Sequence, residues 1–293
     1  MSIRETKGDQ TFLIFIHILM VIICFLMLYP IFFVLGRSFM SEVERAVRPL
    51  ALIPKDISLT AYEFIFMRGS YIANAYKITI IRTVVGSLSS LFFSTLFAYV
   101  LSRREYPLKT PLTLMVIFTM WFNGGLIPTF LLVRALGLTN NFLVYILPGL
   151  ISAWNMLILR NFIMAIPDTI FESARIDGAH DWTIFIRIVL PLSTAALATI
   201  GLFYAVSQWN AWFDAMIYNS RRELWPMQLF LREIVRNAQA IALTDGSMLP
   251  DLLPPAESVQ MATIVVATVP ILCLYPFLQK YFVKGVMVGS LKG

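Results

Sequence analysis

Two charged residues stand within stretches that are otherwise apolar, and they are the first candidates for chemistry. Asp214 is the only carboxylate in the apolar stretches, and a lone acid of this kind is what a proton- or sodium-coupled carrier would use. Arg82 lies about one turn deeper than Lys77, and a guanidinium there requires a counter-ion, a wet cavity or an anionic ligand. The polar residues at 208–210 precede Asp214 and favour a polar pathway in the same region.

Other chemistry has little support in the sequence. There is no glycine-rich phosphate loop ending in Lys-Ser or Lys-Thr, so the chain lacks the usual means of holding ATP. His17 and His180 are far apart, and no histidine, cysteine and carboxylate cluster has the spacing of a metal site. Cys24 and Cys273 fall within apolar stretches, where packing accounts for them. We therefore expect a chain that is not itself catalytic and that binds no metal.

The composition predicts an integral membrane protein. Hydrophobic residues make up 58% of the 293 residues, charged residues 14%, and the mean hydropathy is +0.76. A helix that crosses the hydrocarbon core needs roughly 20 mostly apolar residues. About six such segments can be found, which predicts an all-α fold in a single domain over residues 1–293. The predicted spans are Thr11–Leu35, Ala73–Leu101, Thr110–Val133, Phe142–Ile166, Pro191–Tyr218 and Val259–Phe282.

The third predicted span contains Gly124, Gly125 and Pro128. Proline removes a backbone donor and glycine weakens a helix, so we expect this span to bend or break there.

An even number of spans puts both termini on one side of the membrane. The short loop after the second span carries Arg103, Arg104 and Lys109, whereas the opposite short loop carries only Arg134. The excess of positive charge in short loops marks the cytoplasmic side. We therefore predict cytoplasmic termini, with external loops at about residues 36–72 and 219–258.

A polar island separates the fourth and fifth predicted spans at about residues 167–190. Pro167 and Asp168 suit the first turn of a helix, and Gly178 suits the left-handed turn that ends one. Asp181 is expected to cap a second helix, which Leu190-Pro191 would stop. Its predicted apolar face, at helical spacing, consists of Trp182, Phe185, Ile186 and Val189. The island is therefore expected to be a helix, a sharp turn and another helix on the cytoplasmic face, a shape suited to docking.

This island resembles the EAA loop of permease subunits in bacterial ABC importers, and the fold it implies is the type I importer permease fold. The resemblance rests on Glu172-x-Ala174-x-x-Asp177-Gly178-Ala179 followed by Ile188-x-Leu190-Pro191, with Ser173 where the family usually has alanine. The run at residues 122–128 and the ending at 281–293 look like the MalG-type, LplC-like carbohydrate branch. The implied ATPase-docking residues are Glu172, Ser173, Ala174, Asp177, Gly178, Ala179, Leu190 and Pro191.

The resemblance also implies a location and a set of partners. The chain would reside in the bacterial cytoplasmic (inner) membrane beside a second, different permease subunit. Two ATP-binding subunits would dock beneath and hold the ATP and Mg²⁺, while this chain would bind no cofactor. A solute-binding protein would deliver carbohydrate from outside, and the stretch Trp225–Leu253 would contact it. No nucleic-acid partner is implied, because anionic lipid headgroups account for the net charge of +6.

Aromatic and amide side chains in the spans suit a sugar pathway. The candidates are Arg82, Trp121, Asn123, Trp154, Asn155, Trp209, Asn210 and Trp212. An acidic polysaccharide such as alginate and a neutral oligosaccharide fit these residues about equally. Two alternatives to an importer stay open, namely an ion-coupled secondary carrier that uses Asp214 and a non-transporting membrane assembly subunit.

Overall fold

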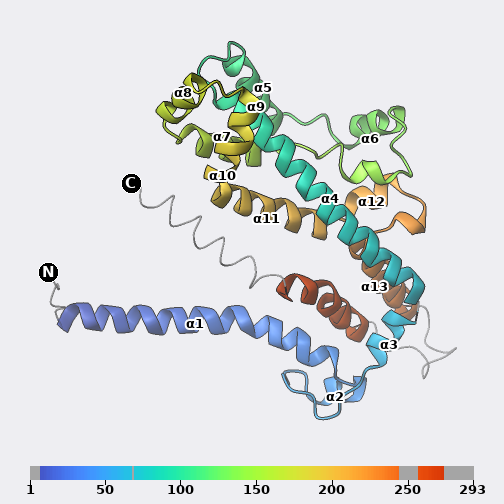
Figure 1. Cartoon of the computed structure of the whole chain (residues 1–293). Coiled ribbons are helices and arrows are strands. Elements are labelled where there is room, and N and C mark those ends of the chain that lie inside the picture. Colours follow the sequence, from blue (N-terminus) through green and yellow to red (C-terminus); the bar gives the residue numbers. More distant parts are fainter. Residues whose placement is uncertain (1–6, 68, 244–256, 274–293) are drawn as a thin grey trace. The chain divides into compact units, whose positions relative to one another are not determined.

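The computed structural model describes residues 7–67, 69–243 and 257–273, and within these the architecture is helical, with a single isolated bridge between Met40 and Ile57 (Figure 1). Contacts divide the chain into two compact units, residues 1–68 with 231–270 and residues 69–230 with 271–293. The all-helical prediction is confirmed.

In the first unit, α1 (Lys7–Ser38) is a long apolar helix that continues through Pro30. Its apolar side chains are exposed over most of its length, as suits a helix that meets lipid. Two short helices follow, α2 (Glu42–Val47) and α3 (Thr60–Phe66).

Buried arginines in the last turn of α1 and in α2 contact the start of the helix Glu257–Cys273. The Arg37 guanidinium is 2.5 Å from a carboxylate oxygen of Glu257 and donates to the Pro49 carbonyl. Arg45 donates to the hydroxyl of Ser258. Residues 36–67 of the predicted external stretch therefore pack within the first unit, whereas residues 69–72 are the start of α4 (Gly69–Ser102) in the second unit.

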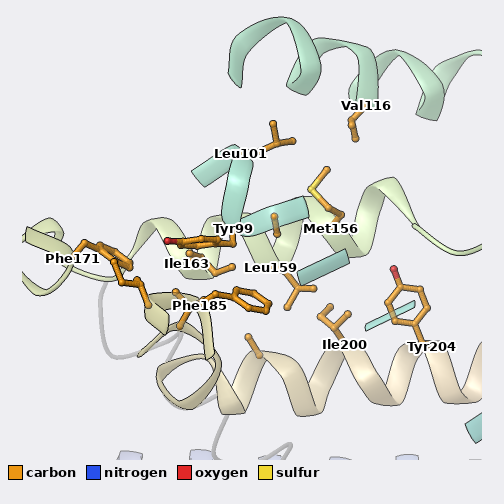
Figure 2. Close-up of a cluster of buried hydrophobic side chains, with 14 residues drawn as sticks. Tyr99, Leu101, Val116, Met156, Leu159, Ile163, Phe171, Phe185, Ile200 and Tyr204 are labelled. Atoms are coloured by element: carbon orange, nitrogen blue, oxygen red, sulfur yellow. The ribbon is translucent and has the colours of Figure 1, made fainter. Parts of the chain in front are cut away.

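The second unit is built around α4 (Gly69–Ser102), which packs against α7 (Ala153–Met164) and α11 (Thr194–Asn210). Figure 2 shows the buried cluster between them, where Leu101, Met156, Leu159 and Ile200 are at most 1% exposed. The other helices are α5 (Lys109–Trp121), α6 (Leu126–Ala135), α8 (Asp168–Ile176), α9 (Asp181–Ile184), α10 (Leu190–Leu192), α12 (Phe213–Tyr218) and α13 (Met227–Leu243). The boundary between the two units falls within α13. Short helical turns cover Phe142–Tyr145, Phe185–Val189 and Arg222–Leu224.

The first three predicted spans agree with the structure. Helical segments Gln10–Ser38 and Tyr71–Ser102 are long and apolar enough to cross a membrane. The third span is broken as predicted, because α5 and α6 are bent by 118° at the Gly124-Gly125 break. Gly125 has φ of +87°, a conformation that suits glycine.

The fourth predicted span, Phe142–Ile166, is wrong as a continuous helix. A 3-10 turn covers Phe142–Tyr145, and the α-helix begins only at Ala153. Pro148-Gly149 interrupts helical hydrogen bonding between them, and the Ser152 side chain caps the new helix by accepting from the Asn155 N–H.

The fifth and sixth spans also need revision. The fifth bends by 83° at Ser193 and its long helix ends at Asn210, with α12 as a separate piece. The sixth is described as the apolar helix Glu257–Cys273, and its predicted end lies outside the described residues. In the described ranges, two helices can cross a membrane, or up to four if each bent pair is one span.

We expect Gly36→Ala to destabilise the first unit. A Cβ at Gly36 would lie 1.8 Å from the Leu52 carbonyl oxygen, so the backbone must move, at a cost of about 1–3 kcal/mol. Gly124→Ala is the control, because its nearest atom would be 3.8 Å away on Pro128. Thermal unfolding in detergent measures both, and equal midpoints would contradict the close packing at Gly36.

Candidate functional site

The helix α8 ends in a turn that requires glycine. Gly178 has φ of +79°, its N–H donates to the Arg175 carbonyl, and the Ala179 N–H donates to the Ala174 carbonyl. These two bonds form the Schellman motif, which satisfies carbonyls left free at a helix end. The predicted left-handed stop at Gly178 is confirmed.

One face of α8 is anchored and the other is open. Phe171 is 4% exposed and lies in the core cluster of Figure 2, with the Arg103 guanidinium 4.4 Å above its ring. Arg104 forms an ion pair of 3.2 Å with Asp168 at the start of the helix. The predicted docking residues Glu172, Ser173, Asp177 and Gly178 are exposed, whereas Ala174 and Ala179 are half-buried. The loop therefore presents a polar surface on a packed base.

Arg175 ties α8 to the loop after α4. Its Nη1 lies 2.6 Å from both carboxylate oxygens of Glu105, and its Nη2 lies 3.7 Å from Asp181. The hydrogen bond from Arg175 holds the pKa of the Glu105 carboxyl below its ordinary value. The same bond raises the pKa of Arg175. The Arg175 guanidinium thus joins three segments, namely α8, the loop after α4 and the start of α9.

The second helix of the island differs from the prediction in two respects. His180, not Asp181, occupies the N-cap position, and Asp181 is the first helical residue. The helix also continues past Pro191 to Leu192 and breaks at Ser193. Leu190 is half-buried and Pro191 exposed.

The continuation past Pro191 is made possible by a π-helical turn over Phe185–Val189. Proline lacks an N–H and its ring crowds the carbonyl four residues earlier, and the wider turn relieves both problems. The wider turn also changes the buried face. Phe185 and Val189 are buried as predicted, but Ile184 replaces Trp182 and Ile186, which are 54% and 44% exposed.

A second polar centre surrounds Arg82, which is 1% exposed. Its Nη2 and Nη1 lie 2.6 Å and 3.3 Å from the two carboxylate oxygens of Asp214, and Nη1 also donates to the Ala211 carbonyl. Its Nε donates to the side-chain oxygen of Gln208 at 3.1 Å, and its guanidinium lies 4.3 Å from the centre of the Tyr145 ring. The counter-ion that the sequence required for Arg82 is Asp214.

This centre borders a pocket of about 410 Å³. Its lining includes Arg82, Tyr145, Asn155, Tyr204, Gln208 and Asp214, contributed by α4, α7, α11, α12 and the turn Phe142–Tyr145. Asn155 is 9% exposed, and its side-chain amide has no hydrogen-bond partner among the residues that the structure describes. The lining of the pocket is therefore polar and partly aromatic, and it includes one amide that is free of partners among the described residues and can hydrogen-bond with a ligand.

The structure brings two of the eight predicted pathway residues, Arg82 and Asn155, into this pocket. The others lie elsewhere. Trp121 and Trp154 are 81% and 62% exposed, whereas Trp209 is buried and Trp212 packs against the cluster around Val133. The Asn123 side chain accepts a hydrogen bond from the Gly125 N–H, and the Asn210 side chain donates one to the Val206 carbonyl of its own helix.

Sequence reasoning did not single out Tyr145 and Tyr204. The Tyr145 hydroxyl donates to the Leu224 carbonyl, and the Tyr204 hydroxyl lies 2.6 Å from that of Ser94. A tyrosine in an apolar stretch resembles any other large core residue, so only the tertiary contacts reveal that these two line a pocket.

Comparisons with known proteins agree over almost the whole chain. No family model matches. The chain is 44% identical over 264 residues to the polygalacturonan/rhamnogalacturonan transport system permease protein YtcP of Bacillus subtilis, covering 90% of this chain and 92% of that protein. It is 40% identical to the protein LplC of the same organism, covering 90% and 89%.

A solved structure also matches over almost the whole chain. It belongs to a bacterial ABC transporter involved in the import of the acidic polysaccharide alginate, with a TM-score of 0.82, 32% identity, and coverage of 96% of this chain and 100% of that one. The chain belongs to the permease subunits of bacterial carbohydrate ABC importers. This permease is MalG-type and LplC-like, as its sequence indicated, and it is an integral inner-membrane subunit that is not itself catalytic.

We expect Phe171→Ala to loosen the loop at residues 167–190 of this permease. Removing a buried aromatic ring costs about 3 kcal/mol, and here it also removes the base on which Arg103 rests. Ile176→Ala on the same helix is the control, because Ile176 is 86% exposed and such changes stay within about 0.5 kcal/mol. Equilibrium unfolding in detergent and hydrogen exchange of α8 report both, and equal protection of α8 in the two variants would contradict the anchoring.

The Arg175–Glu105 pair should make α8 sensitive to acid. Because the pKa of Glu105 is lowered in the folded chain, its stabilising effect is complete above the ordinary carboxyl pKa of about 4.3 and is lost as the pH falls through the lower folded pKa. We expect Glu105→Gln to speed hydrogen exchange in α8 at pH 7, with the difference from wild type vanishing in acid. A difference that persists in acid would show that the charge is not the cause.

Proposed function

We propose that this permease passes oligosaccharides or polysaccharide fragments into the cytoplasm, and that separate ATPase subunits drive it through the loop at about residues 167–190. The observation that carries the proposal is the attachment of α8 to the loop after α4. Arg104–Asp168 and Arg175–Glu105 join the docking helix to the short basic loop that the charge distribution places in the cytoplasm. The exposed face of α8 then points to a cytoplasmic partner.

The ATPase contact is proposed to consist of the exposed side of this loop. Glu172 and Asp177 supply charge, and Ile176 supplies an apolar contact that is 86% exposed. Gly178 sets the turn between the two helices. The docking residues proposed from the motif are Glu172, Ser173, Ala174, Asp177, Gly178, Ala179, Leu190 and Pro191, and the structure adds Ile176.

The remaining partners are proposed on the ground of family membership. A second, different permease subunit completes the pathway, two ATP-binding subunits hold ATP and Mg²⁺, and a solute-binding protein delivers the sugar. Both termini lie in the cytoplasm in this proposal, and the stretches 36–72 and 219–258 face outward toward the solute-binding protein. The permease chain itself binds no cofactor.

The proposed substrate class rests on the similar proteins. One is named for polygalacturonan and rhamnogalacturonan, and another belongs to an importer of alginate. These are acidic polysaccharides, so fragments of acidic polysaccharide are the substrates to test first, beside neutral oligosaccharides.

Ion pairing of Asp214 weakens the alternative of a secondary carrier. A coupling carboxylate must gain and release its ion, whereas Asp214 is held by Arg82 through two oxygens and accepts a further bond from the Ala215 N–H. A non-transporting assembly subunit is disfavoured by the pocket among α4, α7 and α11.

Glu172→Lys should abolish capture of the ATPase. The reversed charge lies at the centre of the proposed contact, so affinity purification from the native cell in mild detergent should recover the second permease but little ATPase. ATP-driven sugar uptake in proteoliposomes should fall at least tenfold. Arg134→Glu, an exposed charge reversal on α6 outside the loop 167–190 and outside the stretches proposed to face the solute-binding protein, is the control and should retain both.

Gly178→Pro tests the turn independently. Proline fixes φ near −65°, so it cannot adopt the +79° found at this position. We expect normal insertion with loss of coupling. Wild-type ATPase capture and uptake in both loop variants would overturn the docking assignment, and uptake driven by an ion gradient without nucleotide would favour the carrier.

A further inference from the structure

The pocket beside Arg82 is electrically balanced. Four of the five N–H groups of this guanidinium have acceptors, two of them the carboxylate oxygens of Asp214. The face of the group is covered by the Tyr145 ring. An arginine that is 1% exposed and bound in this way offers almost nothing to an incoming anion.

A carboxylate entering this pocket would meet Asp214 before it could use Arg82. The Asp214 side chain is 28% exposed, whereas that of Arg82 is 1% exposed. Two like charges in a partly dehydrated site repel each other, and displacing Asp214 would break a paired, hydrogen-bonded ion pair. The pocket therefore disfavours an acidic sugar ring, although it contains an arginine.

The rest of the lining suits an uncharged, hydroxyl-rich ring. The Asn155 amide has both a donor and an acceptor and no partner among the described residues, and sugar hydroxyls can satisfy both. Tyr145 and Tyr204 also line the pocket, but they are 3% and 5% exposed and one face of Tyr145 is covered by Arg82, so they add only a small aromatic area. The volume of about 410 Å³ is near the lower end of the range for small-molecule sites, about 300–1,000 Å³, which fits a short piece of a saccharide rather than a long chain.

We propose that this pocket is a binding site for a neutral sugar unit, that Asn155 is the side chain that recognises it, and that Asp214 determines its specificity by neutralising Arg82. The inference rests on the proposed carbohydrate import and adds the class of sugar that this subunit holds. For an acidic polymer, the same arrangement keeps the pathway from retaining its charged units.

The test uses the two permease subunits with their ATPases, purified in detergent without the solute-binding protein, and two disaccharides of the same linkage, one of galactose and one of galacturonate. Equilibrium dialysis measures the affinity for each. For the wild type we expect the neutral disaccharide to bind at least tenfold more tightly. Equal or tighter binding of the acidic disaccharide overturns the proposal.

Two variants assign the binding to this pocket. Asn155→Ala should weaken the neutral disaccharide about tenfold, which is the effect of losing hydrogen bonds to an amide, while Asn161→Ala, an exposed position of the same helix, should leave it unchanged. Asp214→Asn should free Arg82 and raise the affinity for the acidic disaccharide by about tenfold or more relative to the neutral one. An unchanged preference in Asp214→Asn, or unchanged binding in Asn155→Ala, rejects the site.

A double variant separates charge from folding. Asp214→Asn leaves a buried guanidinium without its counter-ion, so Asp214→Asn combined with Arg82→Gln restores a neutral network. This double variant should keep the wild-type preference for the neutral disaccharide, and an acidic preference there would contradict the role of Arg82. If Asp214→Asn alone does not fold, the proposal is still tested by three measurements. These are the ratio of the wild-type affinities for the two disaccharides, the affinity of Asn155→Ala and the preference of the double variant. ATPase capture through Glu172 is measured separately, so the importer function can hold even if this site fails.

Discussion

A buried guanidinium is the constraint on which the second unit depends. Arg82 is 1% exposed within a membrane-spanning helix, where an unpaired charge costs several kcal/mol. Its acceptors come from α11, from α12 and from the Ala211 carbonyl between them, while its face rests on the turn at Phe142–Tyr145. The hydrogen bonds and ring contact of Arg82 therefore hold four segments against α4, namely α11, the residue Ala211, α12 and the turn at Phe142–Tyr145. The pocket is the space that these segments leave between them.

Broken helices account for most of the departures from simple spans. Gly124-Gly125, Pro148-Gly149 and Ser193 each interrupt a stretch whose composition alone would allow a continuous helix. Within a membrane, such breaks are tolerated only where the freed backbone groups find partners or line a cavity. Here the Asn123 and Ser152 side chains accept from freed N–H groups, and the Pro148-Gly149 segment lines the pocket. The interruptions thus produce the polar features of the permease.

The helix α4 connects the two candidate sites. From Arg82 to Ser102 it rises about 30 Å, at 1.5 Å per residue. At its C-terminal end Tyr99 and Leu101 pack with Phe171 and Phe185 of the loop at residues 167–190, and the Leu101 carbonyl accepts from Arg160. The packed cluster at this end of α4 and the pocket at Arg82 are thus joined by one continuous helix. The same packing explains why Phe171 of α8 is buried.

The sequence by itself determined the membrane class, the break at Gly124-Gly125, the turn at Gly178 and the motif at residues 172–191 that indicated the family. These features are local, because apolar length, proline, glycine and the left-handed conformation act on a few neighbouring residues. The sequence also indicated that Arg82 and Asp214 were costly in apolar surroundings. Only the tertiary structure decided that they neutralise each other, since they are 132 residues apart and each could equally have met water or a ligand. For the same reason, the roles of Tyr145 and Tyr204, the π-helical turn before Pro191 and the unpaired amide of Asn155 depend on packing between distant segments, which no local pattern specifies.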